Sequence, residues 1–567
     1  MAPSWLSSAR FVIKAVGGYT AVRVVLSVAA VIVALASPSR LASEIVLGLV
    51  TVVVVAGWVV QFVRSRSGDE SQFLLGDLAH PRVLIVLAAL AISPLDPVTV
   101  TAAALLCALL VGERMMRRPV HSAMPQAANI PGWDVPLPST QTSNRLFAVD
   151  TIGMVFFVIS AMFGITQIPA LVAAAAGLAL AAVLSLQAVR FLIKRNRFEA
   201  KLPKILKEIR PAFCFHWQAP VGTAYQAAMW LPYLDRIGLP YFVLVRTAAN
   251  FREVSKLTNA PVILRVGLQD LDRIVTPSLK AVFYANTAVR NSHMIRFPHL
   301  THIQLNHGDS DKIASASPTF RQYDKNFVAG QAAIDRFAKH NVATLPEQFE
   351  IVSRPQLEHV QRATVGIDQV AQPTVLYSPT WSGFYEDSDY SSLPAGVAIV
   401  EALLARGCTV VFRPHPYARK HVANANACTA IIELLREDAR QTGREHLFGP
   451  VAETEMSVID CFNSVDAMVS DVSSLVSDFL ISDKPFAMAA VSAHGDEFLD
   501  EFPLGEAAYV FDVVGADAVG FADLLSTMLG TDPQRERRRS LRSYYLGDIP
   551  RDELVNHFTS TARKFLV

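Results

Sequence analysis

Cysteine is scarce in this chain and follows no spacing typical of metal sites or disulfide frameworks. The 567 residues include five cysteines, at positions 107, 214, 408, 428 and 461, and none forms a CxxC pair or a Cys/His cluster. An odd, scattered set argues against structural disulfides and indicates a reducing compartment for the part of the chain outside a membrane. The sequence therefore predicts no metal site.

Several common catalytic signatures are also missing. No GxGxxG follows the first predicted strand, and the sequence contains no GxxxxGK[ST], HExxH or GxSxG. These absences argue against a nicotinamide cofactor, a P-loop, a zinc-dependent protease and an α/β-hydrolase. The formal net charge is only +1, from 51 basic and 50 acidic residues, so no nucleic-acid partner is expected.

Hydrophobic residues are abundant but unevenly distributed. They make up 51% of the chain and concentrate in the first two hundred residues, which predicts a membrane domain at 1–200. A spanning helix needs roughly 20 apolar residues. The apolar runs lie at 20–37, 44–63, 82–95, 98–112, 148–166 and 169–190. We expect Arg23 in the first run to extend toward the membrane interface. The third and fourth runs, split by "SPLDP", predict either two full spans or a re-entrant hairpin.

Basic residues fall on alternate loops between these runs. They are Arg10, Lys14, Arg64, Arg66, Arg114, Arg117, Arg118 and the segment "RFLIKRNRFEAKLPK". The positive-inside rule then predicts about six spans in a plasma membrane, with both termini and the soluble domains cytoplasmic. A cleaved signal peptide ending near "ALAS" is the alternative for the first run. Residues 119–147, rich in proline and polar residues, predict a cytoplasmic loop with little regular structure.

From about residue 205 the pattern changes to short strands alternating with helices. The predicted strands are "AFCFHW", "YFVLVR", "PVILRV", "AVFYAN", "THIQLN", "NFVAG", "FEIVS", "TVLYSPT", "TVVFRPHP" and "AMVSD". Helical patterns lie between several of them, as at 223–237 and 395–407. Such alternation predicts parallel sheets built from βαβ units. We expect two Rossmann-like domains facing a cleft, at 201–325 and 326–567, with ligands at the carboxyl ends of the strands.

The first polar motif at a strand end is "NHGDSDK". His307 could take a proton near neutral pH. Gly308 would allow a positive φ or a close backbone approach. Asp309 and Asp311 would raise the pKa of the histidine through their charge. The alternative is a polar surface loop with no catalytic role.

Two further motifs end the next predicted strands. "YSPTWSG", residues 377–383, offers the Thr380 hydroxyl and the flat face of Trp381, or else forms a turn with a packing tryptophan. In "FRPHP", residues 412–416, two prolines restrict the backbone around Arg413 and His415. An arginine beside a histidine suits an anionic group such as a pyrophosphate.

The fourth motif is "VSDVSSLVSDFLISDKP", residues 469–485. The strand is expected to stop at Asp471, and Ser473 or Ser474 to cap a helix that runs to about 482. A helix N-terminus can bind phosphate, and Asp478 would lie on the same face as Ser474. An ordinary capped helix is the alternative.

Together and in this order, the four motifs resemble those of the CDP-glycerol glycerophosphotransferase family of teichoic-acid-type polymer synthesis. The resemblance covers roughly 205–567 and rests on "HGDSDK", "YSPTW", "RPHP", "VSDVSSLVSDFL" and "DKP". It implies a GT-B-like fold that transfers an alditol phosphate from a CDP-alditol such as CDP-glycerol, releasing CMP. The acceptor would be a hydroxyl of a lipid-linked or glycan acceptor. No cofactor is expected to be required, with Mg²⁺ possible on the diphosphate.

The resemblance also implies roles for individual residues. His307 would deprotonate the acceptor, while Arg413 and His415 would contact the donor pyrophosphate and the leaving CMP. Ser473, Ser474, Asp478 and Thr380 would help to hold the donor, with Gly308, Lys312 and Asp471 in support. The sequence departs from the family pattern at Asp309, Ser310, Asp311, Ser382 and Val472, which leaves donor and acceptor open. A GT-B glycosyltransferase using a nucleotide sugar and a non-catalytic membrane scaffold remain alternatives.

Overall fold

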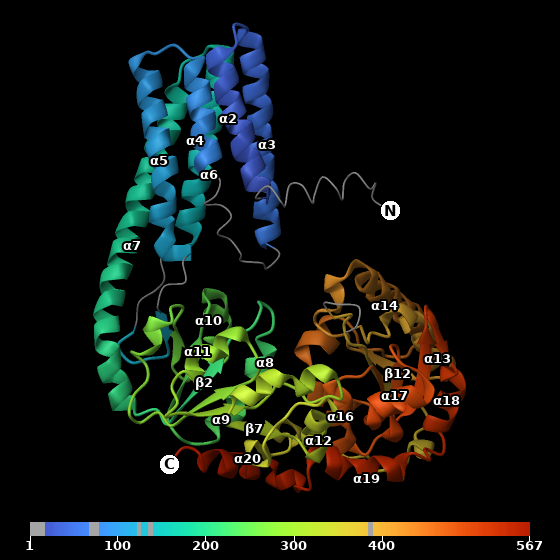
Figure 1. Ribbon diagram of the computed structural model, residues 1–567. Helices are drawn as coiled ribbons and strands as arrows, with labels where there is room; N and C mark the ends of the chain where they lie inside the picture. The colour runs from blue at the N-terminus through green and yellow to red at the C-terminus, as the bar shows by residue number, and fades with distance from the viewer. Residues whose placement is uncertain (1–17, 67–78, 122–125, 134–139, 384–388) are drawn as a thin grey trace. The chain divides into compact units, whose positions relative to one another are not determined.

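The computed structural model describes residues 18–66, 79–121, 126–133, 140–383 and 389–567 (Figure 1). The chain divides into two compact units. Unit 1 comprises Met1–Glu208, Val245–Ser255 and Pro261–Ile274, and unit 2 comprises Ile209–Leu244, Lys256–Ala260 and Val275–Val567. Arg10 and Lys14, which entered the prediction of topology, lie outside the described residues.

The apolar runs of unit 1 all form helices, as predicted. They are α2 (Gly18–Ala36), α3 (Arg40–Arg66), α4 (Ala79–Ala91), α5 (Pro97–His121), α6 (Thr140–Phe163) and α7 (Ile168–Ile209). By length and composition, four helices could cross a membrane: α3, α5, α6 and α7. At 13 residues, α4 would span only about 20 Å, less than the roughly 30 Å of a hydrocarbon core.

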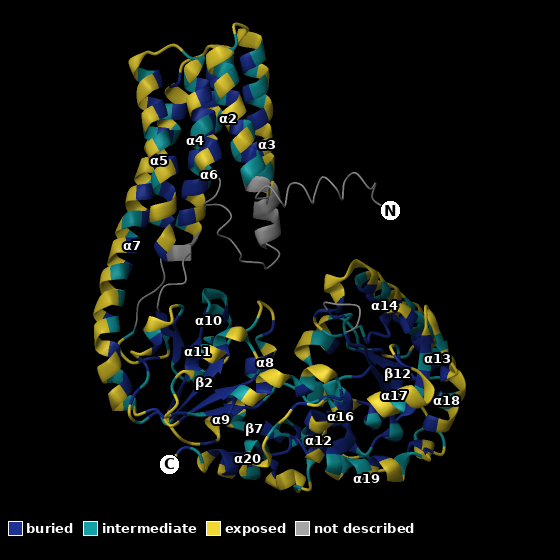
Figure 2. Ribbon diagram, in the orientation of Figure 1, coloured by how far each residue is buried: buried dark blue, intermediate teal, exposed yellow. Residues whose placement is uncertain are grey.

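The outer faces of these helices carry exposed apolar side chains. Leu35, Leu49, Val111 and Phe163 are all more than 60% exposed, and the buried faces turn toward neighbouring helices (Figure 2). Exposed apolar surface on this scale fits contact with lipid better than with water. Arg23 differs from its prediction. It is only 9% exposed and packs in the space left by Gly57, whose Cβ would come within 2.3 Å of the guanidinium.

A buried ion-pair network joins three helices of unit 1. Glu113 of α5 accepts hydrogen bonds from Arg82 of α4 and Arg117 of α5, each at 2.7 Å. Arg117 also donates to the Ser143 hydroxyl of α6 at 2.7 Å. Arg117 was predicted to be a loop charge, but α5 continues to His121 and places this side chain inside the bundle.

Replacing Glu113 with glutamine is expected to destabilise unit 1 by about 3–5 kcal/mol, because two buried guanidinium groups would lose their counter-charge. Thermal unfolding of the detergent-solubilised chain measures this loss. Glu44→Gln is the matched control, since the Arg40–Glu44 pair is largely exposed and contributes little. Equal effects of the two substitutions would contradict the structural role of the network.

The segment 119–147 contains more regular structure than predicted. Strand β1 (Gln126–Ala128) pairs antiparallel with β4 (Val262–Leu264), also of unit 1. Trp133 packs against Phe198 of α7, with ring centroids 4.6 Å apart. Composition alone could not reveal this order, because a partner more than a hundred residues away supplies the hydrogen bonds of β1. Residues 122–125 and 134–139 lie outside the described residues.

The first sheet of unit 2 has the order β3-β2-β5-β6-β7-β8. Parallel pairing joins β2 to β5 and continues through β6 and β7 to β8. These strands are short apolar runs, buried almost throughout, as expected for parallel strands covered on both faces. Their bounds are β2 (Phe213–Trp217), β3 (Tyr241–Val245), β5 (Ala281–Tyr284), β6 (Thr301–Gln304), β7 (Lys325–Val328) and β8 (Phe349–Ile351).

Short helices connect or follow these strands. The predicted helix at 223–237 is interrupted at Met229 and Trp230, and Pro232 lies in the first turn of the second helix, α9. The helices are α8 (Tyr225–Ala228), α9 (Leu231–Asp235), α10 (Ala248–Val254, in unit 1), α11 (Ser292–Ile295), α12 (Gln331–Lys339) and α20 (Leu554–Arg563).

The second sheet has the order β10-β9-β11-β12-β13-β14 and is parallel except at β13–β14. Its strands are β9 (Thr374–Ser378), β10 (Thr409–Phe412), β11 (Ala467–Ser470), β12 (Phe486–Ala490), β13 (Tyr509–Val514) and β14 (Asp517–Val519). Its helices are α13 (Gly396–Ala405), α14 (Val422–Thr442), α15 (Val458–Ser464), α16 (Ser474–Phe479), α17 (Gly495–Glu501), α18 (Phe521–Met528) and α19 (Arg535–Leu546).

The prediction of an α/β fold with two mostly parallel sheets is confirmed. The change from one sheet to the other lies between Ile351 and Thr374, beyond the predicted boundary at 325/326. The reason is that β7 and β8, which follow the "HGDSDK" loop, pair with β6 rather than starting a new sheet.

Candidate active site

Polar loops from both sheets meet within unit 2. Three of them leave β9, β10 and β11, which are parallel neighbours and therefore end at the same sheet edge. The fourth leaves β6 of the other sheet. A Cβ on Gly308 would lie 2.6 Å from the Ser474 hydroxyl, so the "HGDSDK" loop touches the start of α16. The four predicted motifs therefore form one site.

The imidazole of His307 is held in one orientation. Its Nδ1 lies 3.0 Å from the carbonyl oxygen of Ala285, just after β5. Because a carbonyl only accepts, Nδ1 carries the proton and Nε2 keeps a lone pair. Burial of this half-buried side chain lowers its pKa, and the positive charge of Arg354 lowers it further. His307 is therefore neutral at pH 7 and able to accept a proton.

The turn before His307 depends on Asn306 rather than on Gly308. Asn306 has a φ of 56°, in the left-handed region that asparagine tolerates, and Gly308 is not among the glycines with positive φ. Gly308 is required because Ser474 approaches its backbone closely, and a close approach was the second of the two predicted reasons for this glycine.

Asp309 and Asp311 point away from the histidine. Both form ion pairs with Arg336 of α12, which is 5% exposed. Asp311 also accepts hydrogen bonds from the backbone N–H of Leu504 at 3.1 Å and the hydroxyl of Tyr545 at 2.9 Å. The expected rise in the pKa of His307 is therefore wrong, because a guanidinium neutralises these carboxylates. Their contacts join α12, α19 and the "HGDSDK" loop.

Substituting Asp311 with alanine should lower the free energy of unfolding by about 3 kcal/mol, since a buried arginine and two hydrogen-bond donors lose their acceptor. Donor selectivity should stay unchanged. Denaturant unfolding and a donor competition assay measure the two quantities. Asp335→Ala serves as the control, because Asp335 binds the exposed Tyr544 hydroxyl. A change in donor preference with full stability would instead assign Asp311 to substrate recognition.

Lys312 and Asp471 form the charged centre of the site. The Lys312 ammonium lies 4.8 Å from the ring centroid of Tyr390. Burial lowers its pKa to about 8, opposed by the charges of Asp471 and Asp389. Burial raises the pKa of Asp471 to about 6, although hydrogen bonds and Lys312 favour its charged form. The backbone N–H of Thr380 donates to Asp471 at 2.6 Å, which links the "YSPTW" loop to the end of β11.

His415 is held as a neutral hydrogen-bond donor. The backbone N–H of Tyr417 donates to His415 Nδ1 at 3.1 Å, so the imidazole proton is on Nε2. Trp381 stacks on the imidazole with centroids 6.1 Å apart. Burial lowers the pKa of His415 to about 4, helped by the charges of Lys312, His307 and Lys420. This electrostatic coupling shows that both histidines and Lys312 share one environment.

Two predicted donor ligands have structural partners instead. Arg413 donates from Nη1 to the backbone carbonyls of Ala452 and Met456, at 2.8 Å for Met456. Asp478 accepts two hydrogen bonds from Arg354, at 3.1 and 3.2 Å. Neither contact could be read from the sequence, because each joins residues at least 39 positions apart. The Asp478 carboxylate therefore orients Arg354 beside His307.

The helix after β11 is also shorter than expected. Ser473 is at the N-cap position, but its side chain makes no capping hydrogen bond, and α16 has six residues before a 3₁₀ turn to Ser482. The Ser473 hydroxyl lies 3.4 Å from that of Ser470. Capping by Ser473 is thus not found, whereas Ser474 lies against Gly308 in the site.

Sequence reasoning missed three residues of the site. Arg354 is the third residue after β8, and the rule that ligands bind at strand ends could have identified it. Tyr390 and Ser392 lie in an irregular segment with no distinctive pattern. Tyr390 lies under Lys312, and Ser392 hydrogen bonds to Asp471 and Tyr377.

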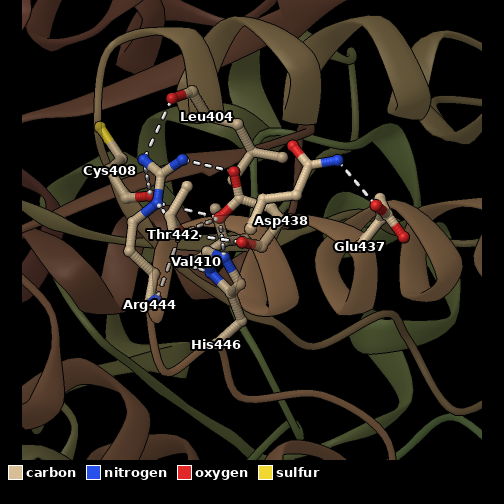
Figure 3. Close-up of polar contacts among 9 residues, drawn as sticks. Leu404, Cys408, Val410, Glu437, Asp438, Thr442, Arg444 and His446 are labelled. Carbon is tan, nitrogen blue, oxygen red and sulfur yellow. Dashed lines mark hydrogen bonds and ion pairs between the residues drawn. The ribbon is translucent and has the colours of Figure 1, made fainter.

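A His–Asp pair that the four motifs do not include lies on α14 and the loop after it (Figure 3). His446 Nε2 is 2.8 Å from Asp438, and the backbone N–H of Val410 donates to His446 Nδ1 at 3.0 Å. Both ring nitrogens are therefore occupied, so this pair fixes the end of α14 against β10. Across the ranges that the structure describes, no group of three His, Cys, Asp or Glu side chains is placed to hold a metal ion.

Comparison with known proteins agrees with the sequence motifs. Residues 351–496 match the family described as CDP-glycerol:poly(glycerophosphate) glycerophosphotransferase. The match includes the second, third and fourth motifs and excludes "HGDSDK". No curated protein matches the chain significantly.

Several solved structures show a distant similarity. The wall teichoic acid polymerase TagF soaked with CDPG is 13% identical, covering 67% of this chain and 97% of its own, with a TM-score of 0.41. A putative UDP-N-acetylglucosamine 2-epimerase from Listeria monocytogenes is 11% identical, covering 62% and 95%, with a TM-score of 0.39. HepE from Anabaena with UDP and glucose is 12% identical, covering 62% and 99%, at 0.37. These scores are too low to carry an argument.

The family match and the motifs coincide at the same strand ends. Three of the four loops that meet in the site lie inside the matched residues. Residues 351–496, about a quarter of the chain, are therefore similar to the CDP-glycerol:poly(glycerophosphate) glycerophosphotransferase family, in the part that carries three of the four motifs.

Proposed function

We propose that this protein is a membrane-anchored transferase that moves glycerol phosphate, or a related alditol phosphate, from a CDP-alditol to an acceptor hydroxyl. The acceptor is a lipid-linked or glycan chain of the cell envelope, and CMP is released. The observation that carries the proposal is the His307 geometry. A neutral imidazole with Nδ1 fixed by Ala285 presents Nε2 beside Lys312 and His415.

The proposed reaction begins at the acceptor. His307 Nε2 takes the hydroxyl proton while the hydroxyl oxygen attacks the phosphorus atom that carries the alditol. The bond from this phosphorus to the bridging oxygen breaks, and CMP leaves with the electron pair. An alcohol is a weak nucleophile without such a base, so the fixed orientation of His307 is the main contribution of the first sheet.

The donor side supplies positive charge and hydrogen-bond donors. In this proposal Lys312 and the Nε2–H of His415 contact the diphosphate as negative charge moves onto the leaving CMP. Ser474 adds a hydroxyl where the "HGDSDK" loop meets the start of α16. Thr380 lies next to Asp471, to which its backbone N–H donates. Arg413 contributes indirectly, by fixing the loop at 451–456. That no cofactor is required, with Mg²⁺ possible on the diphosphate, remains a prediction.

The proposal places the two sheets in a GT-B-like arrangement of two Rossmann-like domains. The first domain would extend to about residue 351, and the second would begin by β9. The helices of unit 1 would anchor the enzyme in the plasma membrane as a multi-pass domain, with the transferase part on the cytoplasmic side. This anchor suits an acceptor that is itself attached to lipid.

Donor choice tests the proposal. Membranes containing the protein are incubated with radiolabelled CDP-glycerol and, separately, with nucleotide sugars. Release of CMP from CDP-glycerol that depends on the protein is expected. Turnover of a nucleotide sugar without CMP release would favour the glycosyltransferase alternative, and normal biological function without any turnover would favour a scaffold.

A further inference from the structure

A group of arginines surrounds one carboxylate at the far end of the α16 segment, where it packs on α19 (Figure 1). Asp483 accepts a hydrogen bond from Arg539 Nη2 at 2.9 Å and lies 3.8 Å from Arg535. We name this group the arginine surface. Its members are Arg362, Arg535, Arg539, Arg542 and Arg551.

The backbone holds Arg362 within this group. The N–H of Ala363 donates to the carbonyl of Ser482 at 2.8 Å, directly before Asp483. Arg551 donates to the carbonyl of Val360 at 2.7 Å. Arg362, Arg535 and Asp483 line a cavity of about 240 Å³, but Asp368, Asp466, Asp532 and Lys484 line it too, so the cavity itself is not basic and the arginine surface lies at its rim. These backbone hydrogen bonds therefore fix the position of Arg362 in the arginine surface.

Three other arginines lie close enough to Arg362 to affect its charge. Its pKa is lowered by burial and by the charges of Arg542, Arg551 and Arg539, and Asp483 opposes this effect. Arg539 also pairs with Glu536 at 2.8 Å. The guanidinium group of Arg362 is therefore close to three other guanidinium groups and one carboxylate. Arg535 and Arg539 pair with Asp483, and Arg539 also pairs with Glu536, whereas among the described residues no ion pair involves Arg362, Arg542 or Arg551. These three guanidinium groups could therefore bind an external anion.

The shape of the surface suits a linear anion. Arg535, Arg539 and Arg542 are spaced i, i+4 and i+7, which places them on one face of α19 over about 10 Å. Arg362 and Arg551 lie near this face, since residue 363 bonds to Ser482 and Arg551 bonds to Val360. Residues 535–553 expose no large apolar side chain, whereas segments that insert into a bilayer surface pair basic residues with apolar ones.

The distance to the active site also favours a chain over a nucleotide. Ser474 touches Gly308 in the site, and Asp483 follows the last residue of the same helical segment. Six α-helical and three 3₁₀ residues between them span about 15 Å. Asp483 also lies just before β12, at the amino end of the parallel strands, whereas the donor motifs gather at their carboxyl ends. A polymer several repeat units long could extend from one edge of the sheet to the other.

We propose that the arginine surface binds the phosphodiester-linked acceptor chain several repeat units behind the hydroxyl that receives the next group. This inference rests on the proposed function and specifies the acceptor as an alditol-phosphate polymer. Binding at a distance from the reacting end favours long acceptors over short ones and keeps the growing chain bound between transfers.

Acceptor length tests the inference in the full detergent-solubilised chain. In the double variant Arg362→Gln/Arg542→Gln, the KM for a poly(glycerol phosphate) of about ten units should rise about tenfold, as expected for lost charge-assisted contacts. The kcat and the KM for a two-unit acceptor should not change. Arg537→Gln is the matched control, because Arg537 also lies on α19 but pairs with Glu506 and is not part of the arginine surface. Arg362→Lys/Arg542→Lys should retain most of the binding.

Direct binding separates this inference from the proposed function. Labelled poly(glycerol phosphate) is titrated against the protein without any donor, so the readout does not depend on turnover. Arginine-dependent binding without CMP release would support the surface while rejecting the proposed donor. Unchanged polymer binding in the glutamine double variant would overturn the inference. The inference would also be overturned if the glutamine double variant bound phosphatidylglycerol bicelles more weakly than wild type but bound the polymer equally well. That result would assign the surface to lipid.

Discussion

Replacing His307 with glutamine is expected to lower kcat for CMP release by about 100- to 10,000-fold, the usual contribution of a general base. Glutamine can still donate to the Ala285 carbonyl but cannot take a proton from the acceptor. Donor affinity, measured by calorimetry with CDP-glycerol, should change little. The result would isolate proton transfer from binding.

The matched control is His299→Gln, a substitution of an exposed histidine in the turn before β6. The wild-type pH profile supplies a second check. Because burial lowers the pKa of His307 from the ordinary value of a histidine, the acid decline in activity should lie at lower pH than for an ordinary histidine, as the imidazole becomes protonated. Full activity of the His307→Gln variant would remove this residue from the mechanism.

Replacing Lys312 with glutamine should lower kcat by about 100- to 1,000-fold at pH 7, the range seen when one group that stabilises developing negative charge is removed. The wild-type rate should decline above pH 8, because the pKa of Lys312 is about 8 and only its charged form attracts the diphosphate. Lys312→Arg should retain activity to higher pH, since arginine stays charged.

Lys256→Gln, at an exposed position, controls for a general loss of charge. The pH profiles of wild type, Lys312→Arg and the control should be measured with the same donor and acceptor. If the rates of wild type and Lys312→Arg declined identically at high pH, another group would be titrating. The role proposed for Lys312 would then be rejected.

Local patterns predicted β2 to β11, whereas β1, β12, β13 and β14 were not predicted. The ten predicted strands all exist, because alternating short apolar runs and turn residues specify them locally. The site followed from one physical rule, that parallel strands end at a common edge where polar residues meet. His307, Lys312, His415 and Asp471 therefore share one environment, as the order of the motifs indicated.

Long-range partners account for the failures. Asp311 binds Arg336, Leu504 and Tyr545, and Asp478 binds Arg354, so these carboxylates support the site without facing it. Strand β1 forms only because β4 pairs with it. In each case the competing partner lies far along the chain, and no local property of the residue reveals it. Asp309 and Asp311, which depart from the family pattern, therefore stabilise the loop through ion pairs and hydrogen bonds.

The most direct test of the central claim follows the phosphate next to the alditol. CDP-glycerol labelled with ³²P on this phosphate is incubated with the full-length protein and an acceptor, and products are separated from nucleotides. The account predicts that the label moves to the acceptor while unlabelled CMP is released, and that His307→Gln abolishes both. Label that stays entirely in the nucleotide fraction, with a product formed, would contradict phosphate transfer.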